Sequence, residues 1–211
     1  ERCYADGLHL NGNLERVRAY DVKGCVGDDL VALNAYDWLN SSVNFGPQRD
    51  MVFEDLELIP PKKGGSYPAI RILPAVYRYA DGTEVDCAIS DVVFRKVRGI
   101  RNFKMYAQTP PCQIGKKREW YKVGSGGNIR FEDVVVDFNS PIDCWAGSDY
   151  VNQDPVRGHI APFEFGANLS KVTFKDVTVN FHCDRWRLSH LALVGPKSCR
   201  WSSKKSGELD T

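Results

Sequence analysis

A hexapeptide pattern of apolar and polar residues recurs five times along the chain. Positions one, three and six are apolar, and positions two, four and five are mostly polar or charged. An alternation with a period of two, rich in Val, Ile and Phe, predicts a strand with one buried face, followed by a bend. The five copies are Val17–Val22, Met51–Leu56, Val92–Val97, Ile129–Val134 and Val172–Val177.

A second set of short apolar segments lies between the hexapeptides, and the two sets alternate in fixed order. These segments are residues 8–10, 30–34, 70–73, 103–106, 163–165 and 191–193. The alternation predicts an all-β fold, a parallel β-helix (β-solenoid) with about six coils and long inserted loops. An antiparallel sandwich is the alternative for many short strands. We expect residues 1–195 to form this domain and residues 196–211 a polar C-terminal tail.

Composition narrows the possible partners. The 211 residues are 43% hydrophobic and 26% charged, which is typical of a globular protein with a core. The net charge of +1 gives no electrostatic reason to expect nucleic acid or an anionic membrane as partner. No apolar run approaches the ~20 residues of a membrane helix. Seven cysteines form no CxxC motif, so a metal site of the zinc type is not expected.

One outward-facing residue lies between the inward pair of each short segment. This outward column reads His9, Ala32, Arg71, Lys104, Glu164 and Ala192. Charged side chains on one sheet face predict a cleft, and a solvated outer face is the alternative interpretation. The side chains expected to bind a substrate there are His9, Asn34, Arg71, Lys104, Tyr106, Glu164 and Trp38.

Two acidic motifs precede the first two short segments. Asp6 and Asp29 are each followed by one residue and then the inward pair, so on adjacent strands they are expected ~5 Å apart. Asp28 is offset by one residue. Three carboxylates this close repel one another, which raises the pKa of some of them. One group can then act as a protonated acid and another as an ionised carboxylate, and glycoside hydrolysis requires this division of roles. The sequence therefore predicts Asp6, Asp28 and Asp29 as catalytic. The alternative is turn chemistry, in which Asp caps backbone amides.

These motifs resemble polygalacturonase-type enzymes, glycoside hydrolase family 28, of the pectin-lyase-like β-helix group. Ala5-Asp6-Gly7 is similar to that family's Asn-Thr-Asp-Gly, and Gly27-Asp28-Asp29 is similar to its Asp-Asp motif one coil later. Lys104 partly matches a family Arg-Ile-Lys strand. The resemblance implies a single-stranded, right-handed β-helix. It also implies that Asp28 is the general acid, that Asp6 and Asp29 hold the attacking water, and that the anomeric carbon is inverted.

The chain departs from that family at two places. Tyr4 stands where the family has Asn, and the family's Gly-His-Gly has no counterpart. Pro68 takes the position of that His, and Arg71, the next outward residue, is the candidate in its place. The chain thus resembles a divergent relative, truncated at its N-terminus.

The expected function is hydrolysis of glycosidic bonds in a polysaccharide or oligosaccharide, without a cofactor. The substrate is pectin-like or another polymer, and uronate-containing chains are included. A Ca²⁺-dependent polysaccharide lyase is the first alternative, with the three acids binding Ca²⁺ and Arg71 or Lys104 as base. A non-catalytic carbohydrate-binding or adhesin-like solenoid is the second. Aromatic residues able to stack on sugars in each case are Tyr36, Trp38, Tyr106, Trp145 and Tyr150.

The acidic motifs lie in the first predicted coil, which would expose an apolar cross-section and unpaired strand edges. We expect an upstream domain, a second chain or self-association to cover it. The sequence does not assign a location, although a secreted or periplasmic one is favoured.

Overall fold

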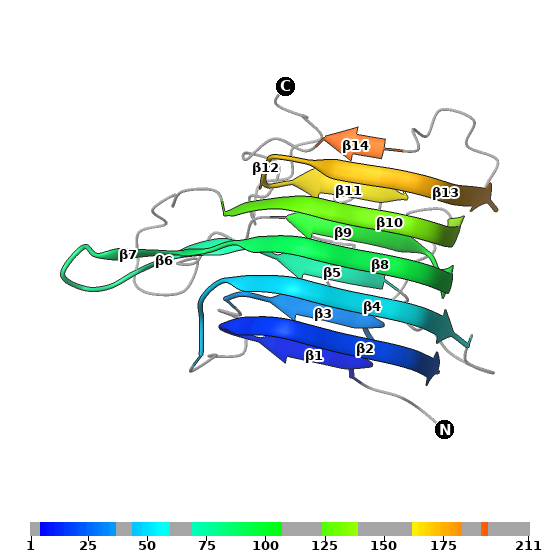
Figure 1. The fold of residues 1–211 in the computed structure, drawn as a ribbon, viewed down its shortest axis with the longest axis horizontal. Coiled ribbons are helices and arrows are strands. Elements are labelled where there is room, and N and C mark those ends of the chain that lie inside the picture. The colour runs from blue at the N-terminus through cyan, green and yellow to red at the C-terminus, as the bar shows by residue number, and fades with distance from the viewer. Residues whose placement is uncertain are drawn as a thin grey trace, which may run out of the picture.

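The computed structural model describes residues 5–36, 44–59, 69–106, 124–138, 162–182 and 191–193. Every regular element in them is a β-strand (Figure 1). The short-strand sheet contains, in spatial order, β1 (Leu8–Asn11), β3 (Val31–Asn34), β5 (Ala69–Leu73), β9 (Asn102–Tyr106), β11 (Phe163–Gly166) and β14 (Leu191–Leu193). No helix in the described residues is long and apolar enough to cross a membrane.

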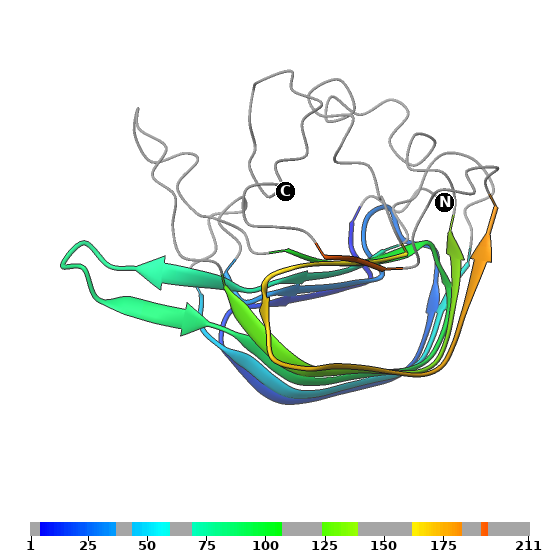
Figure 2. The same cartoon turned by 90° about the horizontal axis from the view of Figure 1, so that it is seen from above.

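The long-strand sheet lies opposite the short-strand sheet, and the chain passes alternately between the two (Figure 2). It contains β2 (Leu14–Gly24), β4 (Gln48–Leu58), β8 (Ile89–Ile100), β10 (Ser125–Phe138), β12 (Asn168–Leu169) and β13 (Val172–Phe181). All pairings in these two sheets are parallel. β6 (Ala75–Arg78) and β7 (Glu84–Cys87) form a separate antiparallel hairpin that projects from the body (Figure 1).

The sequence correctly predicted an all-β chain and both strand sets. The expected single-stranded, right-handed parallel β-helix of about six coils is wrong. The strands instead form two parallel sheets and one small antiparallel sheet. The physical reason is that an apolar period of two identifies strands and their buried faces but not how the chain connects them. The β6–β7 hairpin was also missed, and the predicted tail, 196–211, lies outside the described residues.

Each long strand bends where its backbone enters the left-handed region. The fifth hexapeptide position has φ between +52° and +58° in all five copies: Asp21, Asp55, Lys96, Asp133 and Asp176. The residue before the hexapeptide also has a positive φ, between +49° and +59°, in four of the copies: Arg16, Asp50, Asp91 and Asn128. Asp and Asn tolerate this conformation better than most residues. Because the positions recur strand after strand, the bends lie above one another (Figure 2).

The core lies between the two sheets. The third hexapeptide positions of β4, β8 and β10 carry Phe53, Phe94 and Phe131, each fully buried. Their rings stack at centroid distances of 5.3 and 5.6 Å. Phe174 of β13 extends the stack at 5.3 Å but is 40% exposed. The short-strand sheet packs apolar side chains such as Phe103 against this stack. The phenylalanine stack therefore runs across four of the long strands, β4, β8, β10 and β13.

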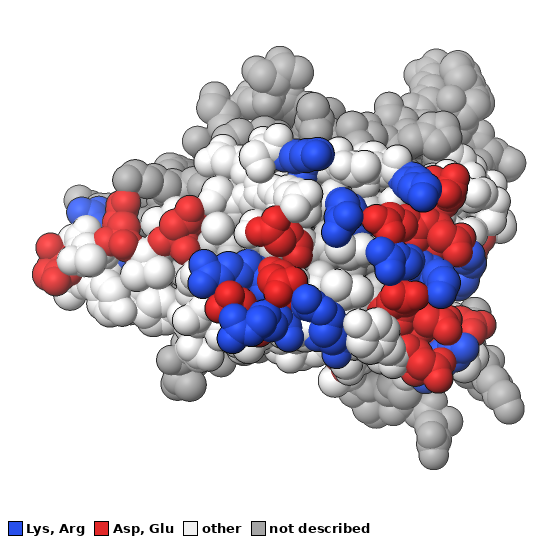
Figure 3. Space-filling model, viewed as in Figure 1, with Lys and Arg blue, Asp and Glu red and all other residues white. Residues whose placement is uncertain are grey.

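The outer face of the long-strand sheet carries mixed and paired charges (Figure 3). Arg95 of β8 lies between two acids, with Nε 2.7 Å from Glu132 and an Nη atom 3.2 Å from Glu54. Arg98 pairs in the same way with Asp133 at 2.6 Å. These ion pairs between neighbouring strands support the predicted strand alignment. They also mix positive and negative side chains, so this face carries no large patch of a single charge.

Candidate functional site: a cluster of three carboxylates

The two acidic motifs lie side by side at the start of β1 and β3. Leu8 pairs with Val31, so Asp6 and Asp29 occupy equivalent positions two residues earlier. The Asp29 amide donates a hydrogen bond of 2.9 Å to Asp6 Oδ1, and the Gly7 amide donates one of 2.9 Å to the Asp29 carbonyl. A Cβ at Gly7 would lie 2.8 Å from the Leu30 carbonyl oxygen, so only glycine permits this approach.

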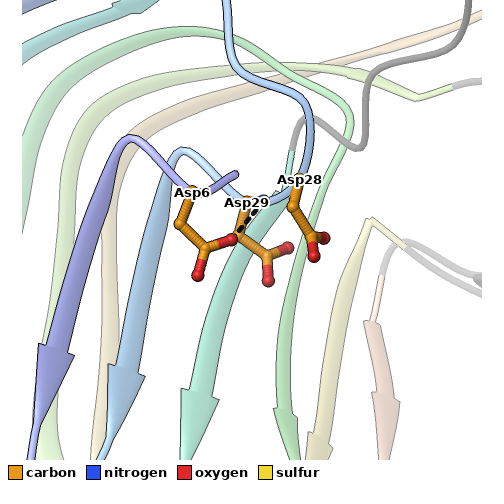
Figure 4. Close-up of side chains that lie close together, drawn as sticks. All are labelled: Asp6, Asp28 and Asp29. Carbon is orange, nitrogen blue, oxygen red and sulfur yellow. Dashed lines mark hydrogen bonds between the residues drawn. The ribbon is translucent and has the colours of Figure 1, made fainter. Parts of the chain in front are cut away.

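One oxygen of each carboxylate lies within 4.8 Å of an oxygen of the other two (Figure 4). The side chains of Asp6, Asp28 and Asp29 are 11%, 49% and 1% exposed. Only Asp28 therefore presents a large surface to an incoming molecule. Proximity of the three acids, predicted from the spacing of the motifs, is confirmed.

Arg71 of β5 lies against two of the acids. Its Nε is 2.9 Å from Asp29 Oδ2, and an Nη atom is 3.7 Å from Asp28 Oδ1. Burial raises the pKa of Asp29 well above its usual value, although Arg71 opposes this effect. Burial also raises the pKa of Asp28, with Arg71 and His9 lowering it and Asp6 raising it further. Asp28 and Asp29 are thus biased toward the protonated form.

His9 connects Asp6 to β3. Its Nδ1 is hydrogen-bonded to Asp6 Oδ2, and its Nε2 lies 2.9 Å from Asn34 Nδ2. With the Asn34 amide donating, Nε2 is the acceptor and Nδ1 carries the proton given to Asp6. Asp6 therefore accepts hydrogen bonds from an imidazole and from a backbone amide, which fix the orientation of its carboxyl group.

The predicted outward column exists as one row across the short-strand sheet. His9, Ala32, Arg71, Lys104, Glu164 and Ala192 are successive partners in the strand register. Lys104 Nζ lies 3.2 Å from Glu164 Oε2, and the Glu164 side chain is only 3% exposed. Ala32 and Glu164 are therefore buried rather than solvated, which speaks against the alternative of a solvated outer face at these two positions, whereas His9 is exposed.

Several predicted residues lie outside the described part of the chain: Tyr4, Trp38, Pro68, Trp145 and Tyr150. Tyr106 is the last residue of β9, and only its backbone is described.

Sequence reasoning named Tyr36 but missed the aromatic cluster to which it belongs, at the far end of β3 and β5. Tyr77 stacks on Phe45 at 3.8 Å, and both contact Tyr36 and Tyr79. The signal was the Asp81-Gly82 dipeptide, which is typical of hairpin turns. Tyr77 and Tyr79 lie just before that turn, and Gly82 adopts φ +91°.

The carboxylate cluster has the composition of an acid–base site, and three carboxylates are also able to ligate a divalent cation. However, Arg71 already supplies positive charge to two of the acids. The chain matches no protein-family model, and no curated protein or solved structure was found to be significantly similar to it.

Proposed function

We propose that the chain hydrolyses glycosidic bonds, with Asp28 as the general acid. The observation that carries the proposal is the cluster itself, in which a half-exposed acid with a raised pKa, Asp28, lies beside Asp6, whose carboxyl group is held by hydrogen bonds. Glycoside hydrolysis uses such a pair, one acid protonating the leaving oxygen and one carboxylate acting at the anomeric carbon or on water.

Asp6 is the partner of Asp28 in this proposal. Its carboxyl group is held in place by the Asp29 amide and by His9. The resemblance implied that Asp29 shares the attacking water with Asp6. Because the Asp29 side chain is 1% exposed and biased toward protonation, we assign it the role of positioning Asp6 and Arg71.

The separation of the acids bears on stereochemistry. Oxygens within 4.8 Å are closer than the ~6.5–9.5 Å usual between the carboxyl groups of inverting enzymes, and near the ~5 Å of retaining ones. The separation therefore favours retention, with Asp6 attacking the anomeric carbon while Asp28 gives its proton to the leaving oxygen. Water, deprotonated by Asp28, then releases the sugar. Proton NMR of the first-formed anomer distinguishes this route from the inversion implied by the resemblance.

A neutral saccharide suits the described residues better than a uronate. Both cations of the row are committed to acids, Arg71 to Asp28 and Asp29, and Lys104 to Glu164. A uronate carboxylate entering there would have to compete with these pairs. We therefore propose a neutral polysaccharide or oligosaccharide as substrate, without a membrane or nucleic acid as partner.

Release of reducing ends tests the function. Purified chain is incubated with xylan, galactan, mannan, xyloglucan and, for comparison, homogalacturonan, each with and without EDTA. The proposal expects reducing ends from at least one neutral polymer, unaffected by chelation. The calcium-dependent lyase alternative is favoured by one observation, the possible ligand set of three acids. It expects instead an unsaturated, ultraviolet-absorbing product that chelation abolishes.

A further inference from the structure

We infer that Asn34 is a positioning residue of the site, which acts through His9 on Asp6. Its amide holds the imidazole in the neutral form with the proton on Nδ1, and the imidazole in turn holds the Asp6 carboxyl group. The sequence predicted Asn34 and His9 as substrate-binding residues, so this role differs from the expected one. The inference rests on the proposed function, in which Asp6 is the partner of Asp28.

The three side chains form a chain of contacts across β1 and β3. His9 pairs with Ala32 in the strand register, and Asn34 follows two residues later, so His9 and Asn34 lie on the same face of the sheet. Asn34 Nδ2 lies 2.9 Å from His9 Nε2, and His9 Nδ1 is hydrogen-bonded to Asp6 Oδ2. Asp6 Oδ1 accepts a hydrogen bond of 2.9 Å from the Asp29 amide. Both oxygens of Asp6 are therefore held, one of them through the imidazole.

The contact at Nε2 decides where the imidazole carries its proton. An amide Nδ2 donates and cannot accept, so His9 Nε2 must be the acceptor. A neutral imidazole with Nε2 as acceptor has its proton on Nδ1, the nitrogen that faces Asp6. A doubly protonated ring would instead place an N–H of His9 against the N–H groups of Asn34. The amide therefore disfavours the charged ring and selects one of the two neutral tautomers.

Burial separates Asn34 from direct contact with a substrate. Asn34 is 3% exposed, whereas the side chains of Asp6 and His9 are 11% and 35% exposed. The influence of Asn34 on a bound saccharide must therefore pass through His9. Because reacting groups need a fixed geometry, loss of this support should slow the chemical step more than it weakens substrate binding.

A neutral His9 also suits the proposed general acid. Positive charge on His9 would lower the pKa of Asp28, whereas burial raises it. The other titratable groups that act on Asp28 are Arg71 and Asp6. An uncharged ring removes one influence against the protonated form of Asp28, which is the form that gives its proton to the leaving oxygen.

NMR of the ¹⁵N-histidine-labelled chain tests the proton position without requiring hydrolysis. In the wild type at neutral pH, His9 should be protonated at Nδ1 and not at Nε2, with its signals assigned by their loss in His9→Ala. Asn34→Asp replaces the donor with an acceptor, so His9 should become protonated at both nitrogens. His182, whose Nε2 lies 3.3 Å from Asp137 Oδ1, should give the same signals in the wild type and in Asn34→Asp.

Kinetics test whether Asn34 acts through His9. On the polymer hydrolysed best, Asn34→Leu removes the donor at similar size and should lower kcat by roughly 10–10²-fold, with KM within about twofold. His9→Ala should lower kcat at least as much. The double variant should be no slower than His9→Ala alone, because both changes break one chain of contacts. The matched control is His182→Ala, which removes a histidine beside a carboxylate outside the site and should keep the wild-type kcat.

Four results would overturn the inference. They are a proton on His9 Nε2 in the wild type, an Asn34→Asp variant in which Nε2 stays unprotonated, additive losses of kcat in the double variant, and an Asn34→Leu variant whose KM rises while kcat is kept. A wild type that carries the proton on Nδ1 but hydrolyses no polymer would defeat the proposed function and still support the assigned contact between Asn34 and His9.

Discussion

Arg71 Nε lies 2.9 Å from Asp29 Oδ2, so a cation on β5 lies against a carboxyl group that is buried in front of β3. This contact joins the second and third strands of the short-strand sheet at the site. Its loss would leave a carboxyl group of 1% exposure without its cation.

Replacing this arginine tests the contact. Arg71→Ala should lower the free energy of unfolding by about 3 kcal/mol, measured by urea denaturation at neutral pH, because without this cation the buried Asp29 carboxyl group must either stay charged and unpaired or take up a proton. The matched control is the double variant Arg71→Ala/Asp29→Asn, in which no buried charge remains, and it should recover most of the loss. A single variant within about 0.5 kcal/mol of the wild type would contradict the role assigned to Arg71.

The pKa of Asp29 predicts a pH dependence of stability. Because burial raises the folded-state pKa above the ordinary value of 3.8, the folded chain binds more protons than the unfolded chain above that pH. Stability from this group is therefore full below pH 3.8 and is lost as pH rises through the folded pKa. Asp29→Asn should show a flatter decline in unfolding free energy from pH 4 upward. Parallel curves for both proteins would rule this coupling out.

The bend positions predict which substitutions the long strands accept. Asp55 has φ +58° and an exposed side chain. Asp55→Val should lower the free energy of unfolding by about 1–2 kcal/mol, because a β-branched residue is strained there. Asp55→Asn, which tolerates that φ, should stay within about 0.5 kcal/mol. Equal values for Val and Asn would show that the bend imposes no such preference.

The phenylalanine stack predicts a gradient of stability along the long-strand sheet. Phe94→Ala removes a fully buried ring between two others and should cost about 4 kcal/mol. Phe174→Ala, at the 40% exposed end of the stack, should cost under about 2 kcal/mol. Thermal or urea unfolding measures both, and a larger loss at Phe174 would contradict the placement of the core.

The strands were predictable because their signal is local. A period of two at Phe94 or Ile70 identifies both the strand and its buried side, and equal spacing before Leu8 and Val31 aligned Asp6 with Asp29. The arrangement of the sheets was not predictable in this way, because it depends on the connections between strands. The expected β-helix was therefore wrong although its strands were found.

The site was only partly predictable for a related reason. Sequence spacing placed Arg71 in the outward column but could not show that it bends back to Asp28 and Asp29, because a side-chain rotamer is set by its neighbours. The pairing of Lys104 with Glu164 was hidden in the same way. Burial of Asp29, which separates its role from that of Asp28, emerges only from the packed structure. That an upstream domain, a second chain or self-association covers β1 and β2 stays a prediction.

The most direct test of the central claim compares Asp28→Asn with Asp55→Asn on the polymer that the wild type hydrolyses best. Asp28→Asn removes the proposed proton donor, and Asp55→Asn removes an exposed acid on the opposite sheet. Measured by release of reducing ends, kcat should fall by about 10²–10⁴-fold in Asp28→Asn and stay unchanged in Asp55→Asn. Equal kcat values for Asp28→Asn and the wild type would contradict the assignment of Asp28 as the general acid.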